Sequence, residues 1–168
     1  AVRDLPADGN ALLDVLQRAG LSVIWLDNNS DCKGTCLRVP HKDIPKNQPG
    51  PFCNGSNCLD EALLQNLQAY IDGLKDNAII VLHADGSHGP EYYDRYPASL
   101  ERFKPVCHTN QLGSCSKDEL VNVYDNTILY TDFFLSKVIE LLKHNSDKYD
   151  TSMLYVSDHG ESLGENGM

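Results

Sequence analysis

The chain has 168 residues, of which 41% are hydrophobic and 23% are charged, and its formal net charge at pH 7 is −10. This length and composition are typical of one globular domain. The acidic balance argues against nucleic acid as a partner, because phosphate binding needs clustered Lys and Arg side chains. No apolar run approaches the roughly 20 residues that a membrane-spanning helix needs.

Both ends of the chain indicate a fragment of a longer protein. The first residue is Ala1 rather than Met, and the last, Met168, falls inside a glycine-rich stretch. We therefore expect residues 1–168 to be part of a single domain that is truncated at both ends.

Helical and strand patterns alternate in the first half of the chain. Apolar residues at helical spacing over 11–19 stop at Gly20, a common helix terminator. The β-branched run 21–26 predicts a strand, 59–74 predicts a second helix, and the apolar run 78–83 predicts a second strand.

A capping box opens the second half, where Ser116 is followed three residues later by Glu119. The helical pattern that begins there runs to about 144, and a third strand is predicted from near Ser152 through Val156. Strands that alternate with helices imply crossover connections. The predicted fold class is therefore α/β, with a mostly parallel sheet flanked by helices.

The six cysteines fall into three close pairs, Cys32 and Cys36, Cys53 and Cys58, and Cys107 and Cys115. An even number of cysteines in local pairs favours three short-loop disulfides and an oxidising compartment. The alternative is a zinc ribbon built from the first four cysteines. Residues 38–58 hold four prolines and little periodicity, so we expect irregular surface there rather than ribbon strands.

Each predicted strand gives way to a loop with polar or ionisable residues. These loops carry Asn29, Ser30 and Lys33 after the first strand, Ser87 and His88 after the second, and Asp158 and His159 after the third. Because the carboxyl ends of parallel strands share one edge of a sheet, we expect the three sets to converge there.

Carboxylate and imidazole suit zinc, and a lysine supplies a movable cation for a phosphoryl oxygen. The convergence therefore predicts a metal site that handles a phosphate. The alternative is a set of ordinary loops, in which Asp158 caps the next segment and both histidines are solvated.

Four motifs carry a resemblance to a known family. They are DNNSDCKG at 27–34, GSHGP at 86–90, YDNT at 124–127 and YVSDHGESLGENG at 155–167. In this order and at these distances they resemble the catalytic domain of phosphoethanolamine–lipid A transferases. Those enzymes underlie intrinsic and mobile colistin resistance and belong to the alkaline phosphatase/sulfatase superfamily.

The resemblance implies a role for each matched residue. Asp158 and His159 would bind the catalytic zinc, and His88 would be a catalytic residue that contacts the phosphoethanolamine phosphate or a second zinc. The substrate pocket would be lined by Asn29, Ser30, Lys33 and His88. The cysteine pairs match the local disulfides of the family, and Asp125 is expected to be a buried structural carboxylate.

The resemblance also implies a mechanism for the intact protein. A zinc-activated threonine attacks the phosphate of phosphatidylethanolamine, and the resulting phosphothreonine passes phosphoethanolamine to a lipid A phosphate. The lower negative charge of lipid A then confers polymyxin (colistin) resistance. The expected location is the periplasmic face of the bacterial inner membrane, reached through a membrane domain absent from this chain, and we expect a monomer.

Several family positions fall outside the chain. The family's threonine nucleophile and a zinc-binding glutamate lie upstream of the matched segment, and a further histidine follows the glycine-rich loop. We therefore expect the fragment to be inactive alone and to bind zinc weakly. Two alternatives stay open: another superfamily member such as a sulfatase or phosphoglycerol transferase, and a non-catalytic, disulfide-stapled binding module.

Overall fold

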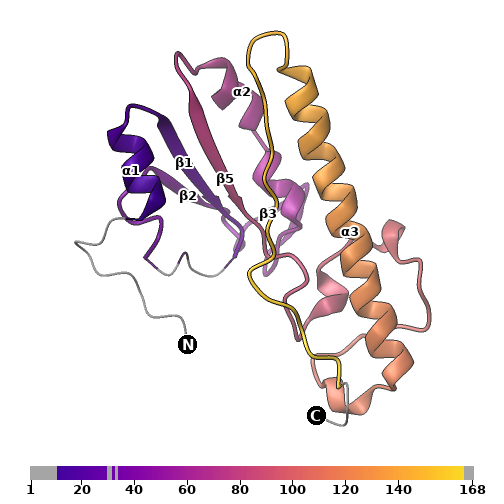
Figure 1. Ribbon diagram of the computed structural model, residues 1–168. Helices are drawn as coiled ribbons and strands as arrows, with labels where there is room; N and C mark the ends of the chain where they lie inside the picture. The colour runs from indigo at the N-terminus through magenta and orange to yellow at the C-terminus, as the bar shows by residue number, and fades with distance from the viewer. Residues whose placement is uncertain (1–10, 30–31, 33, 165–168) are drawn as a thin grey trace. The chain divides into compact units, whose positions relative to one another are not determined.

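The chain divides into two units between Asp85 and Gly86, as seen in a computed structural model that describes residues 11–29, 32 and 34–164. The first unit contains the β-sheets, and the second contains the longest helix (Figure 1). Each unit is described by itself.

A three-stranded parallel sheet forms the framework of the first unit. Strand β1 (Ser22–Asp27) lies in the centre, between β2 (His41–Asp43) and β5 (Ala78–His83). Strands β1 and β5 pair along their full length, so that Asp27 lies opposite His83. The two strands predicted from β-branched and apolar runs are therefore confirmed, and so is the parallel α/β architecture.

The prediction of irregular surface over 38–58 is wrong in part. Besides β2, this segment contains a small antiparallel pair, β3 (Pro49–Gly50) and β4 (Cys53–Asn54). All three residues of β2 are exposed, so the strand carries no apolar alternation. Main-chain hydrogen bonds hold it instead, including one of 2.8 Å from Ile44 to Asp27 next to the strand end.

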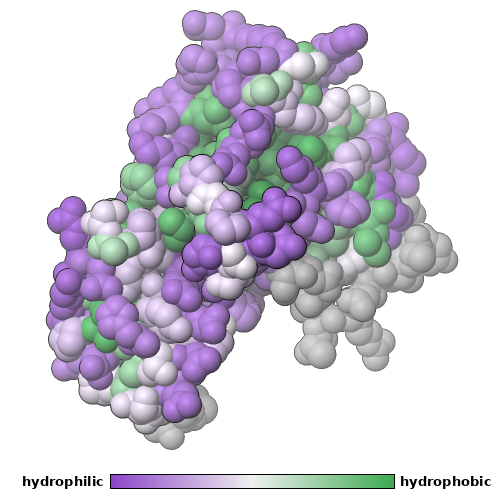
Figure 2. Space-filling view, turned by 180° about the vertical axis from the view of Figure 1, so that it is seen from behind, coloured by the Kyte–Doolittle hydropathy of each residue, from purple (hydrophilic) through white to green (hydrophobic). Residues whose placement is uncertain are grey.

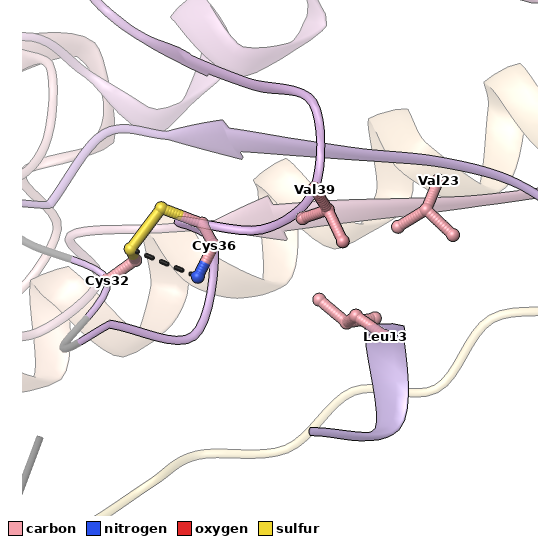
Figure 3. Packing of buried hydrophobic residues seen from close by; sticks show 5 residues of the cluster. All are labelled: Leu13, Val23, Cys32, Cys36 and Val39. Carbon is pink, nitrogen blue, oxygen red and sulfur yellow. Dashed lines mark hydrogen bonds between the residues drawn. A yellow bond between two sulfur atoms is a disulfide. The ribbon is translucent and has the colours of Figure 1, made fainter. Parts of the chain in front are cut away.

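Helix α1 (Leu12–Arg18) covers part of the sheet through Leu13, which is only 8% exposed. Figure 3 shows Leu13 facing Val23 of β1 and Val39, with the Cys32–Cys36 disulfide beside them. The helix ends before Gly20, whose φ of +94° is a conformation that L side chains rarely adopt. The predicted helix over 11–19 and its terminator are confirmed.

A partly buried ion pair fixes the position of α1. The Arg38 guanidinium donates from Nε at 3.0 Å and from Nη2 at 2.7 Å to the Asp14 carboxylate, which also accepts from the Ala11 amide. The hydrogen bonds from Arg38 hold the pKa of Asp14 below its usual range. Two hydrogen bonds from one guanidinium fix the orientation of the two side chains as well as pairing their charges. The ion pair therefore ties α1 to the segment that follows the Cys32–Cys36 disulfide.

The predicted helix over 59–74 is broken into two. A 3₁₀ helix, η1 (Asp60–Leu64), is followed by helix α2 (Leu67–Asp72). Between them Gln65 is extended, and Asn66 has a φ of +60°, which Asn tolerates better than most residues. Leu63, Leu67 and Ile71 of the apolar stripe are still buried. The pattern therefore predicted which side chains are buried, but not that the helix is interrupted.

Helix α3 (Lys117–His144) is the main element of the second unit, and its predicted extent is confirmed. The capping box is also confirmed, because the Ser116 amide donates to Glu119 Oε2 at 2.7 Å and the Glu119 amide donates to Ser116 Oγ at 3.3 Å. The helix packs against two 3₁₀ helices, η2 (Tyr92–Asp94) and η3 (Ala98–Leu100). A third, η4 (Leu112–Ser114), lies shortly before α3.

A buried asparagine anchors the segment between η3 and η4. The side chain of Asn126, which has no exposed surface, accepts from the amides of Arg102 and Phe103 and donates to the Phe103 carbonyl. Its neighbour Asp125 is only half-buried. The prediction that Asp125 is a buried structural carboxylate is therefore wrong, because the adjacent amide occupies the buried face of the helix.

The third predicted strand does not form. Residues 151–157 have no regular structure, and the side chains of Leu154 and Val156 are 89% and 72% exposed. After α3 the chain turns back toward the other end of the helix (Figure 1). A β-strand needs main-chain partners, and no strand of the described part of the chain pairs with these residues.

All six cysteines form disulfides between neighbours in the sequence, Cys32–Cys36, Cys53–Cys58 and Cys107–Cys115. The zinc-ribbon alternative is therefore wrong, since no thiolate remains to bind metal.

Polar side chains predominate on the face shown in Figure 2. Within residues 11–29, 32 and 34–164, no helix has the length and apolar character to span a membrane.

Candidate functional site

The loop before η2 presents His88 from a well-anchored main chain. Thr127 of α3 is fully buried, and its hydroxyl lies 2.7 Å from the Ser87 hydroxyl while donating to the Tyr124 carbonyl. On the other side, Arg95 Nε donates to the His88 carbonyl at 3.0 Å. The imidazole itself is exposed, so the ring of His88 is available to a ligand while its backbone is held on both sides.

Local hydrogen bonds select the same tautomer for His88 and His159. Nδ1 of His88 lies 2.7 Å from the Gly89 carbonyl, and Nδ1 of His159 lies 2.9 Å from the Gly160 carbonyl. Because a carbonyl oxygen only accepts, each Nδ1 carries a proton when this bond forms. In the neutral rings Nε2 is then left with a lone pair that can bind a metal ion or accept a proton.

Asp158 and His159 are neighbouring side chains of the kinds that bind zinc. His159 Nε2 lies 3.8 Å from Asp158 Oδ2, and the two side chains are 53% and 90% exposed. The Gly160 carbonyl and then the Asp158 carboxylate raise the pKa of His159 above its ordinary value. A metal ion must compete with that proton, since imidazole binds metal in its neutral form.

The donor atoms and spacing of this pair fit zinc. In a tetrahedral zinc site with bonds of about 2.0 Å, neighbouring ligand atoms lie roughly 3.3 Å apart, so a small movement of either side chain brings both onto one ion. The pair does not complete a site: within the described ranges no group of three or more His, Cys, Asp or Glu side chains is arranged to hold a metal.

The structure brings together three of the six predicted site residues. The ring of His88 lies edge-on to that of His159 with 6.1 Å between centroids, and Asp158 adjoins His159. Asn29 belongs to the first unit, where its amide donates to Asp27 Oδ1 at 2.7 Å. Ser30 and Lys33 lie outside the described residues.

Sequence reasoning missed a carboxylate–imidazole pair at the carboxyl end of β1 and β5. Asp27 is 4% exposed, and its Oδ2 accepts from Trp25 Nε1 at 2.9 Å and lies 3.0 Å from His83 Nδ1. Its other oxygen accepts from the amide of Asn29. The signal was present, because Asp27 directly follows the first predicted strand and His83 ends the second, but their contact depends on the register of the pair.

The sulfatase family profile matches residues 3–168, and the chain therefore belongs to the sulfatase family. Within it, the chain is 53% identical to phosphoethanolamine transferase EptA of Salmonella typhimurium over 94% of its own length. It is 43% identical to phosphatidylethanolamine transferase Mcr-1 of Escherichia coli, again over 94% of its length. The chain spans only 29% and 30% of these two relatives.

Solved structures also relate the chain to phosphoethanolamine transferases. The chain matches the soluble domain of lipooligosaccharide phosphoethanolamine transferase A from Neisseria meningitidis with a TM-score of 0.85 and 46% identity, over 94% of the chain and 47% of that domain. It also matches the periplasmic domain of phosphoethanolamine transferase EptC from Campylobacter jejuni, with a TM-score of 0.81 and 47% identity. The predicted alkaline phosphatase/sulfatase-like fold is confirmed, and the chain covers part of that domain.

Proposed function

We propose that this chain is part of the catalytic domain of a zinc-dependent transferase that moves phosphoethanolamine from phosphatidylethanolamine to a lipid A phosphate. The observation that carries the proposal is the cluster of His88, Asp158 and His159, in which two imidazoles leave Nε2 available beside a carboxylate. The similarity to phosphoethanolamine transferases supports the choice of substrate group over other esters.

In this proposal Asp158 and His159 hold the zinc ion, together with ligands from outside the chain. When bound, zinc withdraws charge from a phosphoryl oxygen and activates a hydroxyl nucleophile. His88 stands next to this pair and contacts the phosphoryl group. Once its Nε2 is protonated, the ring donates a hydrogen bond to a phosphoryl oxygen and offsets part of the developing charge.

The loop after β1 contributes the remaining substrate contacts in this proposal. Asn29, Ser30 and Lys33 bind the phosphoethanolamine group, with the Lys33 ammonium on a phosphoryl oxygen. The amide of Asn29 is anchored on the buried Asp27, which fixes the start of the loop. Because the chain is acidic, local cations are needed where the phosphate binds.

The intact protein is proposed to work at the periplasmic face of the inner membrane through a phosphothreonine intermediate. In this proposal the threonine and the further zinc ligands come from other parts of the intact protein, and the fragment alone is inactive. Each transfer adds a primary amine to lipid A and weakens its attraction for cationic polymyxins, which confers colistin resistance.

The test uses the full-length protein with labelled phosphatidylethanolamine and lipid A. We expect His159→Ala to lower transfer by more than about 100-fold and to lower zinc content, as loss of a metal ligand should. His144→Ala, at the exposed end of α3, is the matched control and should leave both unchanged. Wild-type transfer by His159→Ala would remove the residue from the site, and hydrolysis of a sulfate ester without transfer would favour a sulfatase.

A further inference from the structure

Tyr92, the first residue of η2, lies beneath the loop that carries His88. Its side chain is 2% exposed and meets the ring of Tyr124 edge-on, with 5.8 Å between centroids. Burial, followed by the nearby Glu161 carboxylate, raises the pKa of Tyr92 to about 12. The hydroxyl therefore stays protonated at neutral pH and acts as a hydrogen-bond donor.

The carboxylate next to this hydroxyl belongs to Glu161, two residues after His159. The amide of Gly89 donates to Glu161 Oε1 at 3.4 Å, and the Tyr92 side chain lies close enough to the same carboxylate for Glu161 to raise its pKa. An ionised carboxylate only accepts, so the Gly89 donor comes from the His88 segment and the acceptor comes from the His159 loop. The two segments are 72 residues apart in the sequence at this contact.

The close approach of Tyr92 depends on the glycine beside His88. A Cβ at Gly89 would lie 2.7 Å from the Tyr92 hydroxyl oxygen and 2.8 Å from Cζ, well inside normal contact distance. Only a residue without a side chain leaves room for the phenol to pass under the loop and reach Glu161. Gly89 and the Tyr92 phenol are therefore closely packed beside the Glu161 carboxylate.

We propose that Glu161 is a positioning residue, which joins the loop at 157–164 to Gly89 and Tyr92 and so keeps the ring of His159 beside that of His88. The two rings are themselves exposed at the site, and their edge contact at 6.1 Å gives them little mutual support. Glu161 connects the two loops, because it accepts from the loop that carries His88. A role as a metal ligand or in substrate binding would instead require the negative charge of Glu161.

This inference deepens the proposed function and rests on it for the effect on transfer. In the full-length protein we expect Tyr92→Phe to lower kcat by about tenfold, as the loss of one hydrogen bond should, and Glu161→Ala, which also removes the acceptor of the Gly89 amide, to lower kcat further, with KM for phosphatidylethanolamine unchanged in both. Glu161→Gln keeps an acceptor oxygen and should recover most of the rate lost in Glu161→Ala. Tyr93→Phe, which removes a hydroxyl from the adjacent residue, is the matched control and should match the wild type.

Two outcomes would overturn the assignment. If Glu161→Gln is as impaired as Glu161→Ala while Tyr92→Phe is normal, the carboxylate acts through its charge. If Glu161→Ala and Tyr92→Phe both transfer at the wild-type rate, the contact has no positioning role.

A readout without substrate separates this inference from the proposed function. Hydrogen exchange of segment 86–91, followed by mass spectrometry, should be faster in Glu161→Ala than in the wild type, because the Gly89 amide loses its acceptor. Unchanged exchange in that variant would refute the contact itself. Faster exchange in a protein that does not transfer phosphoethanolamine would refute the proposed function and leave the contact standing.

Discussion

Replacement of Asn126 by alanine should destabilise the second unit through three lost hydrogen bonds. The side chain is fully buried and bonds the main chain of Arg102 and Phe103 at 2.8–3.0 Å. At about 1 kcal/mol for each bond the loss is about 3 kcal/mol, from which the better helix propensity of alanine subtracts about 0.6 kcal/mol. We expect the free energy of unfolding to fall by about 2.4 kcal/mol.

Asn122, one turn earlier on α3, provides the matched control. It makes a single exposed hydrogen bond, from Nδ2 to the Pro105 carbonyl at 2.8 Å, and its replacement by alanine brings the same gain in propensity. Its net effect should lie within about 0.5 kcal/mol of zero. The two variants therefore differ only in the buried contacts of Asn126.

Urea unfolding followed by far-UV circular dichroism measures both variants. With an m-value of about 2 kcal/mol/M, Asn126→Ala should lower the midpoint by about 1.2 M, and Asn122→Ala should leave it nearly unchanged. Equal midpoints for the two variants would refute the reasoning, because they would show that the three buried bonds add nothing to stability.

Two further predictions concern titration and the pair at the end of β1. Burial raises the pKa of Tyr92 and of Tyr96 to about 12, so the stability that depends on their protonated forms is complete below pH 10 and is lost as the pH rises to 12. The free energy of unfolding should fall by up to about 1.4 kcal/mol per pH unit for each group in that range, and Tyr92→Phe should show a shallower fall. Equal slopes would contradict this origin. Asp27→Ala removes the acceptor at His83 Nδ1, so ¹⁵N spectra of the imidazole should lose the Nδ1-protonated tautomer that they show in the wild type. Persistence of that tautomer would show that another group sets it.

Much of the fold was predictable because its main elements carry strong local patterns. Helix α3 has a capping box and 28 residues of helical structure, and β1 and β5 are six-residue strands in which apolar residues predominate. The exceptions depend on tertiary context. The left-handed conformation of Asn66 divides the second predicted helix although the apolar stripe continues across it, and the run at 153–156 has strand composition but pairs with no strand of the described residues.

The candidate site was predictable only as a set of motifs. His88, Asp158 and His159 were selected because they follow predicted strands, and the structure places the three together even though the last of those strands is absent. The contacts that hold them were not predictable, because Glu161 meets Tyr92 and Asp27 meets His83 only after the chain has folded.

The order of the disulfides also bears on how the chain matures. Each bridge joins one cysteine to the next along the chain, with separations of 4, 5 and 8 residues. An oxidant that acts on thiols as they emerge from the N-terminus onward would join every cysteine to its native partner before the following pair appears. Correct pairing of the cysteines thus requires no prior tertiary structure. Even if the chain folds slowly, it has little need of an isomerase to exchange wrongly paired disulfides.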